Sequence, residues 1–200
     1  MFTARIEELK RLIQNCKYTT YVDDLDETRA LRFLHSQLLK VKDQSRAVYV
    51  IGNGGSAGIA SHFCIDLLNI IQLRASTLYD TNVMTCMSND YGYEEIFSRP
   101  LQTYLQKDDL LVAISSSGSS KNILNAVHVA KEKKANVITL SGFSSTNPLR
   151  ALGDINLWVN AQDYGLVESA HFFLLHTIVD SWEIDFLSLE ATKLSNANAK

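Results

Sequence analysis

The sequence of 200 residues has few of the features that mark secreted, membrane-spanning or nucleic-acid-binding proteins. Its three cysteines form no CxxC pair, and their odd number favours a reducing compartment over a disulfide framework. The amino-terminal segment lacks the about 7–15 apolar residues of a signal peptide, and no run reaches the about 18 apolar residues of a membrane span. Nineteen basic and 22 acidic side chains give a net charge of −3. We therefore expect a cytoplasmic protein with no membrane or nucleic-acid partner.

Proline is also scarce, with two residues, whereas hydrophobic residues make up 46% of the chain and charged residues 20%. This composition argues against disorder and low complexity, because it provides enough apolar surface for a core. The length fits one domain of roughly 100–200 residues. We expect residues 1–200 to form a single domain that includes helices for oligomerisation within residues 1–44.

Short apolar runs alternate with helical patterns along most of the chain. Apolar spacing first predicts amphipathic helices over 2–16 and 26–41. Strands are then predicted over 47–51, 83–87, 110–115, 137–140 and 155–159, and helices over 56–71, 93–105, 120–134 and 165–187. Strands that alternate with helices imply a parallel sheet with helices on both faces. The sequence therefore predicts an α/β fold, a flavodoxin-like three-layer αβα sandwich around a five-stranded parallel sheet.

The two leading helices and the long last helix lie outside this alternation. Their apolar stripes need cover, either from the domain or from other subunits, and we expect a homo-oligomer.

The first of two unusual loops is Gly52–Ser56, which connects a predicted strand directly to a predicted helix. Glycines allow close backbone approach, and a helix N-terminus presents free N–H groups with partial positive charge. The loop is thus a candidate cradle for an anion, with Ser56 as a cap or a donor. An ordinary tight turn is the simpler alternative.

A dinucleotide site is a weaker alternative for the same loop. Gly52 and Gly54 match the first two glycines of G-x-G-x-x-G/A, and Ala57 stands in the last position. The acidic residue expected about 20 positions later would be Asp80, which comes late.

The second unusual loop, 115–120, contains five serines and Gly118 and again connects a strand to a helix. Several hydroxyls and backbone amides around one point suit a phosphate monoester, whose oxygens accept many hydrogen bonds. A flexible serine-rich linker is the alternative, although such linkers do not usually adjoin a buried strand. Neither loop is a P-loop, because G-x-x-x-x-G-K-[ST] is absent.

These loops resemble those of sugar-isomerase (SIS) domain proteins, and of the phosphoheptose isomerases in particular. The resemblance covers nearly the whole chain and rests on GNGGSAGIASHFCIDL (52–67), SNDYGYEEIFSRPL (88–101), ISSSGSSKNILNAV (114–127) and NVITLSGF (136–143). In its final helix the family has a Gln and a His eight residues apart, and these positions are Glu168 and His176 here.

The resemblance implies an SIS fold and an isomerase that converts sedoheptulose 7-phosphate to D-glycero-D-manno-heptose 7-phosphate for lipopolysaccharide precursor synthesis. It implies a homotetramer with active sites at subunit interfaces, and a zinc ion. The family's pattern places the phosphate on Ser56, Ser115, Ser116, Ser117 and Ser120, with Asn53 and Asp90 near the sugar hydroxyls. Gly54, Gly55 and Glu168 complete the expected substrate-binding set.

Four ionisable side chains form a candidate zinc set. His62 and Asp66 are four residues apart and thus lie about 40° apart around one helix. Glu168 and His176 are eight apart, a looser geometry of two turns. Together they offer the nitrogen and oxygen ligands that Zn²⁺ accepts. An alternative assignment pairs Glu168 with His171, which lies three residues further along the helix. The other interpretation of His171 is a buried histidine of the core.

Aldose–ketose isomerisation needs a proton removed from the carbon beside a carbonyl and returned to its neighbour. Our hypothesis assigns Asp66 as the base and His176 as the acid, acting through an enediol, with any metal serving as a Lewis acid. The family's usual Glu is Asp66 here, its Gln is Glu168, and an Asp is replaced by Gly165, with Asp163 nearby. These departures leave another ketose phosphate open as substrate. A non-catalytic SIS tetramer that binds protein partners, such as a replication initiator, is the alternative function.

Overall fold

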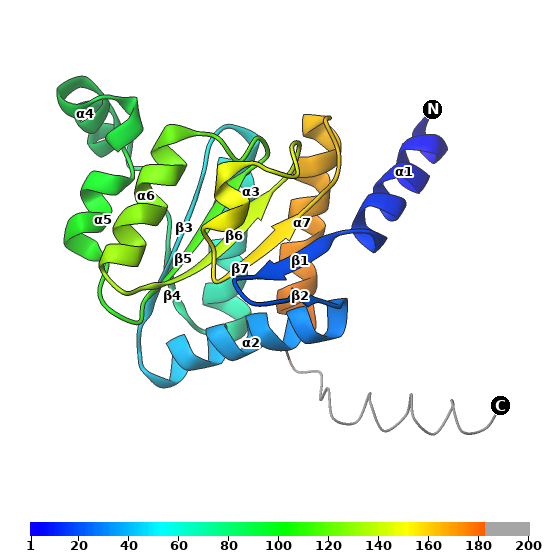
Figure 1. The fold of residues 1–200 in the computed structure, drawn as a ribbon. Coiled ribbons are helices and arrows are strands. Elements are labelled where there is room, and N and C mark those ends of the chain that lie inside the picture. Colours follow the sequence, from blue (N-terminus) through cyan, green and yellow to red (C-terminus); the bar gives the residue numbers. More distant parts are fainter. Residues whose placement is uncertain (183–200) are drawn as a thin grey trace.

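The computed structural model of the protein describes residues 1–182, and a seven-stranded sheet forms its centre (Figure 1). The strand order is β2-β1-β7-β6-β5-β3-β4. The strands are β1 Lys17–Thr20, β2 Asp24–Leu25, β3 Ala47–Gly52, β4 Arg74–Ser76, β5 Leu110–Ser115, β6 Asn136–Ser141 and β7 Ile155–Trp158. The five strands from β7 to β4 are parallel, whereas β1 pairs antiparallel with both β7 and β2.

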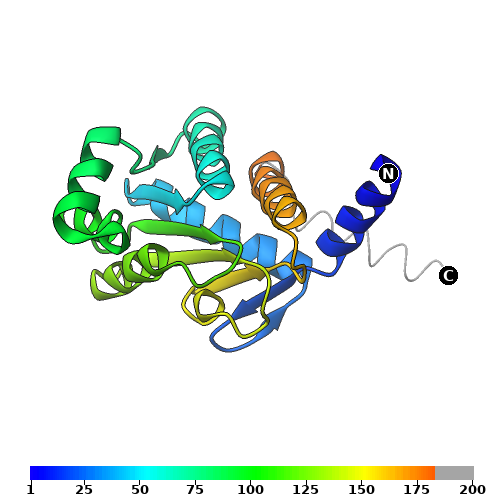
Figure 2. The same cartoon turned by 90° about the horizontal axis from the view of Figure 1, so that it is seen from above.

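Helices cover both faces of this sheet (Figure 2). The α-helices are α1 Phe2–Gln14, α2 Glu27–Asp43, α3 Gly55–Asp66, α4 Thr81–Tyr91, α5 Ser98–Tyr104, α6 Lys121–Glu132 and α7 Tyr164–Asp180. α2, α3 and α7 pack on one face, and α5 and α6 pack on the other. The expected three-layer α/β class is confirmed. In the described part of the chain, no helix combines the length and apolar character that crossing a membrane requires.

The sheet forms because its central strands are apolar on both sides. All six residues of β5 are buried. Successive residues of β5 supply opposite cores: Leu110, Val112 and Ile114 belong to the core on the side of α2, α3 and α7. Leu111 and Ala113 belong to the core on the side of α5 and α6. Continuous apolar runs of this kind are typical of parallel strands covered by helices.

Aspartates fix the first turns of three helices. The side chains of Asp26, Asp80 and Asp163 accept hydrogen bonds from backbone N–H groups at the starts of α2, α4 and α7. Such an N-cap stabilises a helix by about 1 kcal/mol. Asp163, the residue considered as a stand-in for the family's aspartate, therefore sets where α7 begins, and it also accepts from Arg5 of α1 at 3.0 Å.

The expectation of five strands is wrong in number and in one position. Residues 83–87 lie inside α4, because Asp80 caps the backbone N–H of Val83 and starts a helix there. The fifth parallel strand is instead β4, a three-residue segment. β1 and β2, which lie between the two leading helices, add the antiparallel edge that the pattern did not predict.

Several helix boundaries also differ from the predicted ones. The helix expected over 56–71 is α at first and continues as a π-helical turn over Leu67–Ile71, after which Gln72 adopts a positive φ of 61°. The helix expected over 93–105 is divided into a 3₁₀ turn, Tyr93–Glu95, and α5. α7 ends at Asp180, and residues 183–187 of the predicted last helix lie outside the described residues.

Candidate active site

The loop between β3 and α3 is built around a glycine that no other residue replaces easily. Gly54 has a φ of 54°, a conformation that residues with a Cβ rarely adopt. A Cβ on Gly52 would lie 2.6 Å from the carbonyl oxygen of Ser56, so the chain turns tightly into the helix. The Tyr79 hydroxyl supports the turn, since it accepts from the Gly52 N–H at 2.8 Å. The loop therefore exposes the N-terminus of α3 at the end of the sheet.

Two asparagines join this loop to the second one. The Asn53 and Asn122 side-chain amides exchange hydrogen bonds of 3.0 and 2.9 Å, and the Tyr93 hydroxyl donates to Asn53 Oδ1 at 3.1 Å. Asn53 thus connects the end of β3 to the start of α6. The side-chain amide of Asn53 therefore makes hydrogen bonds that hold the two loops together.

The serine-rich loop after β5 is held by its neighbours on several sides. Gly118 has a φ of 62° and packs so closely on Asn147 that a Cβ would lie 1.9 Å from its Oδ1. Its carbonyl accepts from the Leu149 N–H at 3.0 Å. The Ser115 hydroxyl donates to that of Ser120 at 3.3 Å, whereas the buried Ser116 hydroxyl has no partner within the described chain. These contacts argue against a flexible linker and leave the Ser116 hydroxyl available to a ligand.

Both loops face one cavity of about 220 Å³. Its lining is Asn53, Gly54, Gly55, Ser56, Ile114, Ser115, Ser116, Ser117, Ser120, Tyr164 and Glu168. The structure thus brings together every predicted phosphate-binding serine. Three helices, α3, α6 and α7, begin at this cavity, where Gly55, Ser120 and Tyr164 line it, and helix N-termini favour negative charge.

The helices that carry Gly55 and Glu168, α3 and α7, also carry a cluster of His62, Asp66 and His176, whose ligand atoms lie within 4.8 Å of one another. Asp66 Oδ2 is 3.2 Å from His176 Nδ1, and Asp66 Oδ1 is 3.6 Å from His62 Nε2. The Asp66 side chain is 14% exposed, compared with 46% for His62 and 34% for His176. The ring of Phe172 packs edge-on against both imidazoles. Helices α3 and α7, which lie side by side in Figure 2, supply the whole cluster.

The compact group that could hold a metal in the described residues comprises three of the four expected zinc ligands and leaves out Glu168. Its carboxylate lies against Gly55, where a Cβ would be 2.2 Å from Oε2. Eight residues of helix separate Glu168 from His176 by about 12 Å along the axis. Glu168 and Gly55 instead line both the serine cavity and a second cavity of about 390 Å³ that contains His62. Glu168 therefore stands at the boundary between the two.

His171 is the buried core histidine of the alternative interpretation and is not a partner of Glu168. Its ring is fully buried, and Nε2 lies 3.1 Å from the carbonyl oxygen of Ser141 in β6. Burial lowers the pKa of His171 to about 4, because the charged form loses its hydration. The imidazole is therefore neutral and faces the sheet rather than the cluster.

Asp90 is the one predicted substrate contact that the structure places elsewhere. It lies on α4, whose residues are all at least partly exposed, and it is absent from the lining of the serine cavity. Hydrogen bonds from Asn89 and Cys86 lower the pKa of its carboxyl group. Asp90 therefore does not contribute to the cavity within the described residues.

The sequence did not identify Tyr164, Asn122 or Phe172 as parts of the site. Tyr164 begins α7, packs its ring against Phe143 and lines the serine cavity. The one indication in the sequence that Tyr164 could belong to the site was its position at a capped helix start, one residue before Gly165. Asn122 follows the serine loop and was visible only as a helix residue.

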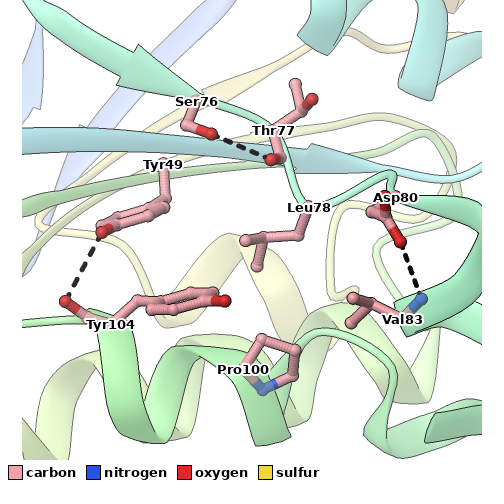
Figure 3. Close-up of a pocket in the computed structure, with 8 residues that line it drawn as sticks. All are labelled: Tyr49, Ser76, Thr77, Leu78, Asp80, Val83, Pro100 and Tyr104. Carbon is pink, nitrogen blue, oxygen red and sulfur yellow. Dashed lines mark hydrogen bonds between the residues drawn. The ribbon is translucent and has the colours of Figure 1, made fainter. Parts of the chain in front are cut away.

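Another cavity, of about 360 Å³, lies where β3 and the segment after β4 meet α4 and α5 (Figure 3). The Tyr49 hydroxyl donates to the Tyr104 carbonyl there, and Leu78 and Pro100 add apolar surface. Its one carboxylate, Asp80, is occupied in capping the Val83 N–H. This cavity has no cluster of ionisable groups for proton transfer.

The fold and the two loops are those of an SIS domain, and the family model described as SIS domain matches residues 20–142. A phosphoheptose isomerase from Campylobacter concisus is 33% identical to this chain, over 85% of this chain and 94% of that protein. The structure of a phosphoheptose isomerase from Neisseria gonorrhoeae matches with a TM-score of 0.78 at 28% identity, covering 91% of this chain and 96% of that one. One from Francisella tularensis gives 0.77 at 27% identity, covering 92% and 97%.

The chain belongs to the phosphoheptose isomerase family, within the SIS-domain proteins. It is an enzyme, a sugar-phosphate isomerase, as the resemblance of its motifs predicted. Neither the dinucleotide alternative for the first loop nor the non-catalytic alternative is favoured by these comparisons.

Proposed function

We propose that this enzyme interconverts sedoheptulose 7-phosphate and D-glycero-D-manno-heptose 7-phosphate, with the phosphate in the serine cavity and the reacting carbons toward Asp66 and His176. One observation carries the proposal. Asp66 and His176, from helices far apart in the sequence, lie 3.2 Å from each other on α3 and α7, and the same two helices contribute Ser56 and Glu168 to the serine cavity. An ionisable pair on the helices that line an anion site is what an isomerase of phosphorylated sugars needs.

The serine cavity would supply binding energy remote from the chemistry. Hydroxyls of Ser56, Ser115, Ser117 and Ser120 and the unpartnered hydroxyl of Ser116 can donate to phosphate oxygens. The N-termini of α3 and α6 add backbone donors and partial positive charge. Binding energy at the phosphate would position the other end of the sugar for reaction.

The Asp66–His176 pair would move the protons. Asp66 takes a proton from C1 of the ketose while His176 donates a proton to the O2 carbonyl oxygen, which forms the enediol. Asp66 then returns the proton to C2, and the O1 hydroxyl gives its proton to His176, which makes the aldehyde and restores both residues. Each proton that leaves one atom is thus accounted for at another, and the product is an isomer of the substrate.

The donor chemistry of the cluster fits a zinc ion, because His and Asp ligands are those that Zn²⁺ accepts. His62, Asp66 and His176 would hold the ion, and when bound it would polarise the substrate oxygens as a Lewis acid. Asp66 has two carboxylate oxygens and His176 two ring nitrogens, so each offers a second polar atom for proton transfer. Glu168, at the cavity boundary, would contact the sugar.

The decisive experiment mixes the protein with sedoheptulose 7-phosphate and follows the sugar by NMR. We expect conversion by the unmodified protein and a fall in kcat of at least about 100-fold in Asp66→Asn, since a general base typically contributes about 10²–10⁴-fold. Inorganic phosphate should still bind to the variant, because the serine loops are intact. Asp180→Asn, an exposed aspartate at the end of α7, is the control. Full activity of Asp66→Asn would remove Asp66 from the mechanism.

We also propose a homotetramer with its sites at subunit interfaces. Apolar side chains are exposed on the outer faces of two helical regions: Phe2 is 89% and Ile6 63% exposed on α1, and Leu68 and Phe173 are about half exposed near the cluster. Isolated exposed apolar residues are ordinary, but a set on neighbouring helices is typical of an interface. Light scattering should give four chains per particle, and Phe2→Asp with Ile6→Asp should reduce that number. A monomer at micromolar concentration would contradict the proposal.

A further inference from the structure

The buried imidazole of His171 contacts the peptide group that supports the serine loop. We propose that His171 is a positioning residue, which fixes the Ser116 backbone for phosphate binding without touching the phosphate. The inference rests on the proposed function, in which the serine loop binds the phosphate. No step of the proton transfer described above uses His171.

A chain of hydrogen bonds leads from His171 to the loop through a single peptide group. His171 Nε2 lies 3.1 Å from the carbonyl oxygen of Ser141, and the N–H of the same peptide, on Gly142, donates to the Ser116 carbonyl at 2.9 Å. Because a peptide group is planar and rigid, a donor at its oxygen fixes the direction of its N–H. The Val159 N–H also donates to the Ser141 oxygen, at 3.0 Å, from the side of β7.

The chemistry of the ring sets the direction of this chain. A carbonyl oxygen only accepts, so Nε2 carries the proton and donates, and Nδ1 is left as an unprotonated acceptor. Nδ1 is buried and has no partner within the described residues, and protonating it would bury an uncompensated charge. His171 therefore acts as a fixed neutral donor.

Packing holds the same peptide group from the side of α7. Val167 lies one helical turn before His171, and a Cβ on Gly142 would be 2.8 Å from its Cγ1. Only glycine lets α7 approach β6 this closely. The hydroxyl of Ser116, at the other end of the hydrogen-bond chain, is buried, unpartnered and part of the cavity lining. Movement of the 141–142 peptide would thus move the hydroxyl that is available to the phosphate.

The test compares His171→Met with His171→Gln, two side chains of nearly equal length of which only glutamine can donate. The inhibition constant of inorganic phosphate, KM for the sugar phosphate and kcat are measured at a temperature where circular dichroism shows both variants folded. We expect His171→Met to raise KM and the phosphate inhibition constant about tenfold, equivalent to about 1.4 kcal/mol. Its kcat should stay within about twofold of the unmodified value, and His171→Gln should restore most of the affinity.

Two further variants separate positioning from general loss of stability. His35 Nε2 donates to the Ile178 carbonyl oxygen at 2.7 Å, away from the serine cavity. His35→Met should therefore lower the melting temperature without changing either constant. Gly142→Ala displaces the same peptide by a different route and should also weaken phosphate binding, so the proposal stays testable if His171→Met does not fold.

A double-mutant cycle with Ser116→Ala decides whether His171 acts through Ser116. We expect non-additive effects, with the double variant binding phosphate little worse than Ser116→Ala alone. If Ser116→Ala weakens phosphate binding but His171→Met leaves it within twofold, the positioning role is overturned and the proposed function stands. Strictly additive effects would also overturn it. If neither Ser116→Ala nor His171→Met changes phosphate binding, the serine cavity is not the phosphate site, and both proposals fail.

Discussion

Gly118 offers a quantitative test of how the serine loop is held. In Gly118→Ala the new methyl group would lie 1.9 Å from Asn147 Oδ1, far closer than non-bonded heavy atoms approach one another. Its φ of 62° adds the cost of a left-handed conformation, roughly 1–2 kcal/mol for a residue with a Cβ. The variant must therefore accept strain and also displace Asn147.

The displacement is costly because Asn147 is buried and fully engaged. Its Nδ2 donates to the carbonyls of Gly142 and Ser144 at 3.1 and 2.8 Å, and its Oδ1 accepts from the Arg150 N–H at 3.0 Å. Each such hydrogen bond contributes about 1 kcal/mol net. Losing two of them and adding the backbone strain gives a loss of roughly 3–4 kcal/mol, a large part of the about 5–15 kcal/mol that stabilises a typical domain.

Two other glycines provide matched controls for urea unfolding experiments. Gly54 has a positive φ of 54° but nothing within 4 Å of a Cβ, so Gly54→Ala should lose only the backbone contribution, about 1–3 kcal/mol. Gly58 lies inside α3 with no positive φ and open space, so Gly58→Ala should gain about 0.5–1 kcal/mol. If Gly118→Ala were less destabilising than Gly54→Ala, the close packing of Gly118 on Asn147 would be wrong.

Two predictions concern pH and metal. Because the pKa of His171 is lowered from 6.5 to about 4, the unfolded chain binds a proton below pH 6.5 that the folded chain does not, so stability should fall between pH 6.5 and about 4. The loss of unfolding free energy, about 3 kcal/mol when complete, should be smaller in His171→Gln. Urea unfolding at pH 7 and 4.5 measures this loss in each protein, and an equal loss in the two would refute the prediction. Dialysis against a chelator should reduce kcat, with recovery on adding Zn²⁺, whereas His62→Ala should fail to recover. Unchanged activity after verified metal removal would exclude a catalytic metal.

The strands that the sequence predicted are those with continuous apolar runs. β3, β5, β6 and β7 are recognisable because helices cover both of their faces, which requires apolar side chains throughout. β4 was missed because it has three residues, of which Arg74 and Ser76 are exposed. β1 depends on pairing with a distant strand, such as Tyr18 opposite Leu157, and local periodicity contains no information on such pairs.

The site shows a similar division between local and long-range information. Helical spacing correctly placed His62 and Asp66 on one face of α3, since that spacing is fixed by the backbone. The choice of His176 over His171 came from the family resemblance, and the structure agrees with it by bringing His176 to Asp66. Spacing did not show that Glu168 would lie over Gly55, because that depends on how closely α7 approaches α3.

Glycines where α7 approaches α3 and β6 explain why one helix can direct Glu168 to the cavity boundary, His171 to the sheet and His176 to Asp66. Gly55 leaves space for the Glu168 carboxylate at the start of α3, and Gly142 leaves space for Val167 at the end of β6. With both contacts made, the rotation of α7 about its axis is fixed. His171 must then face the sheet, and His176, about 140° further round, must face α3. A larger residue at either glycine would turn the helix or push it away, so the position of His176 relative to Asp66 depends on two residues that have no side chain of their own.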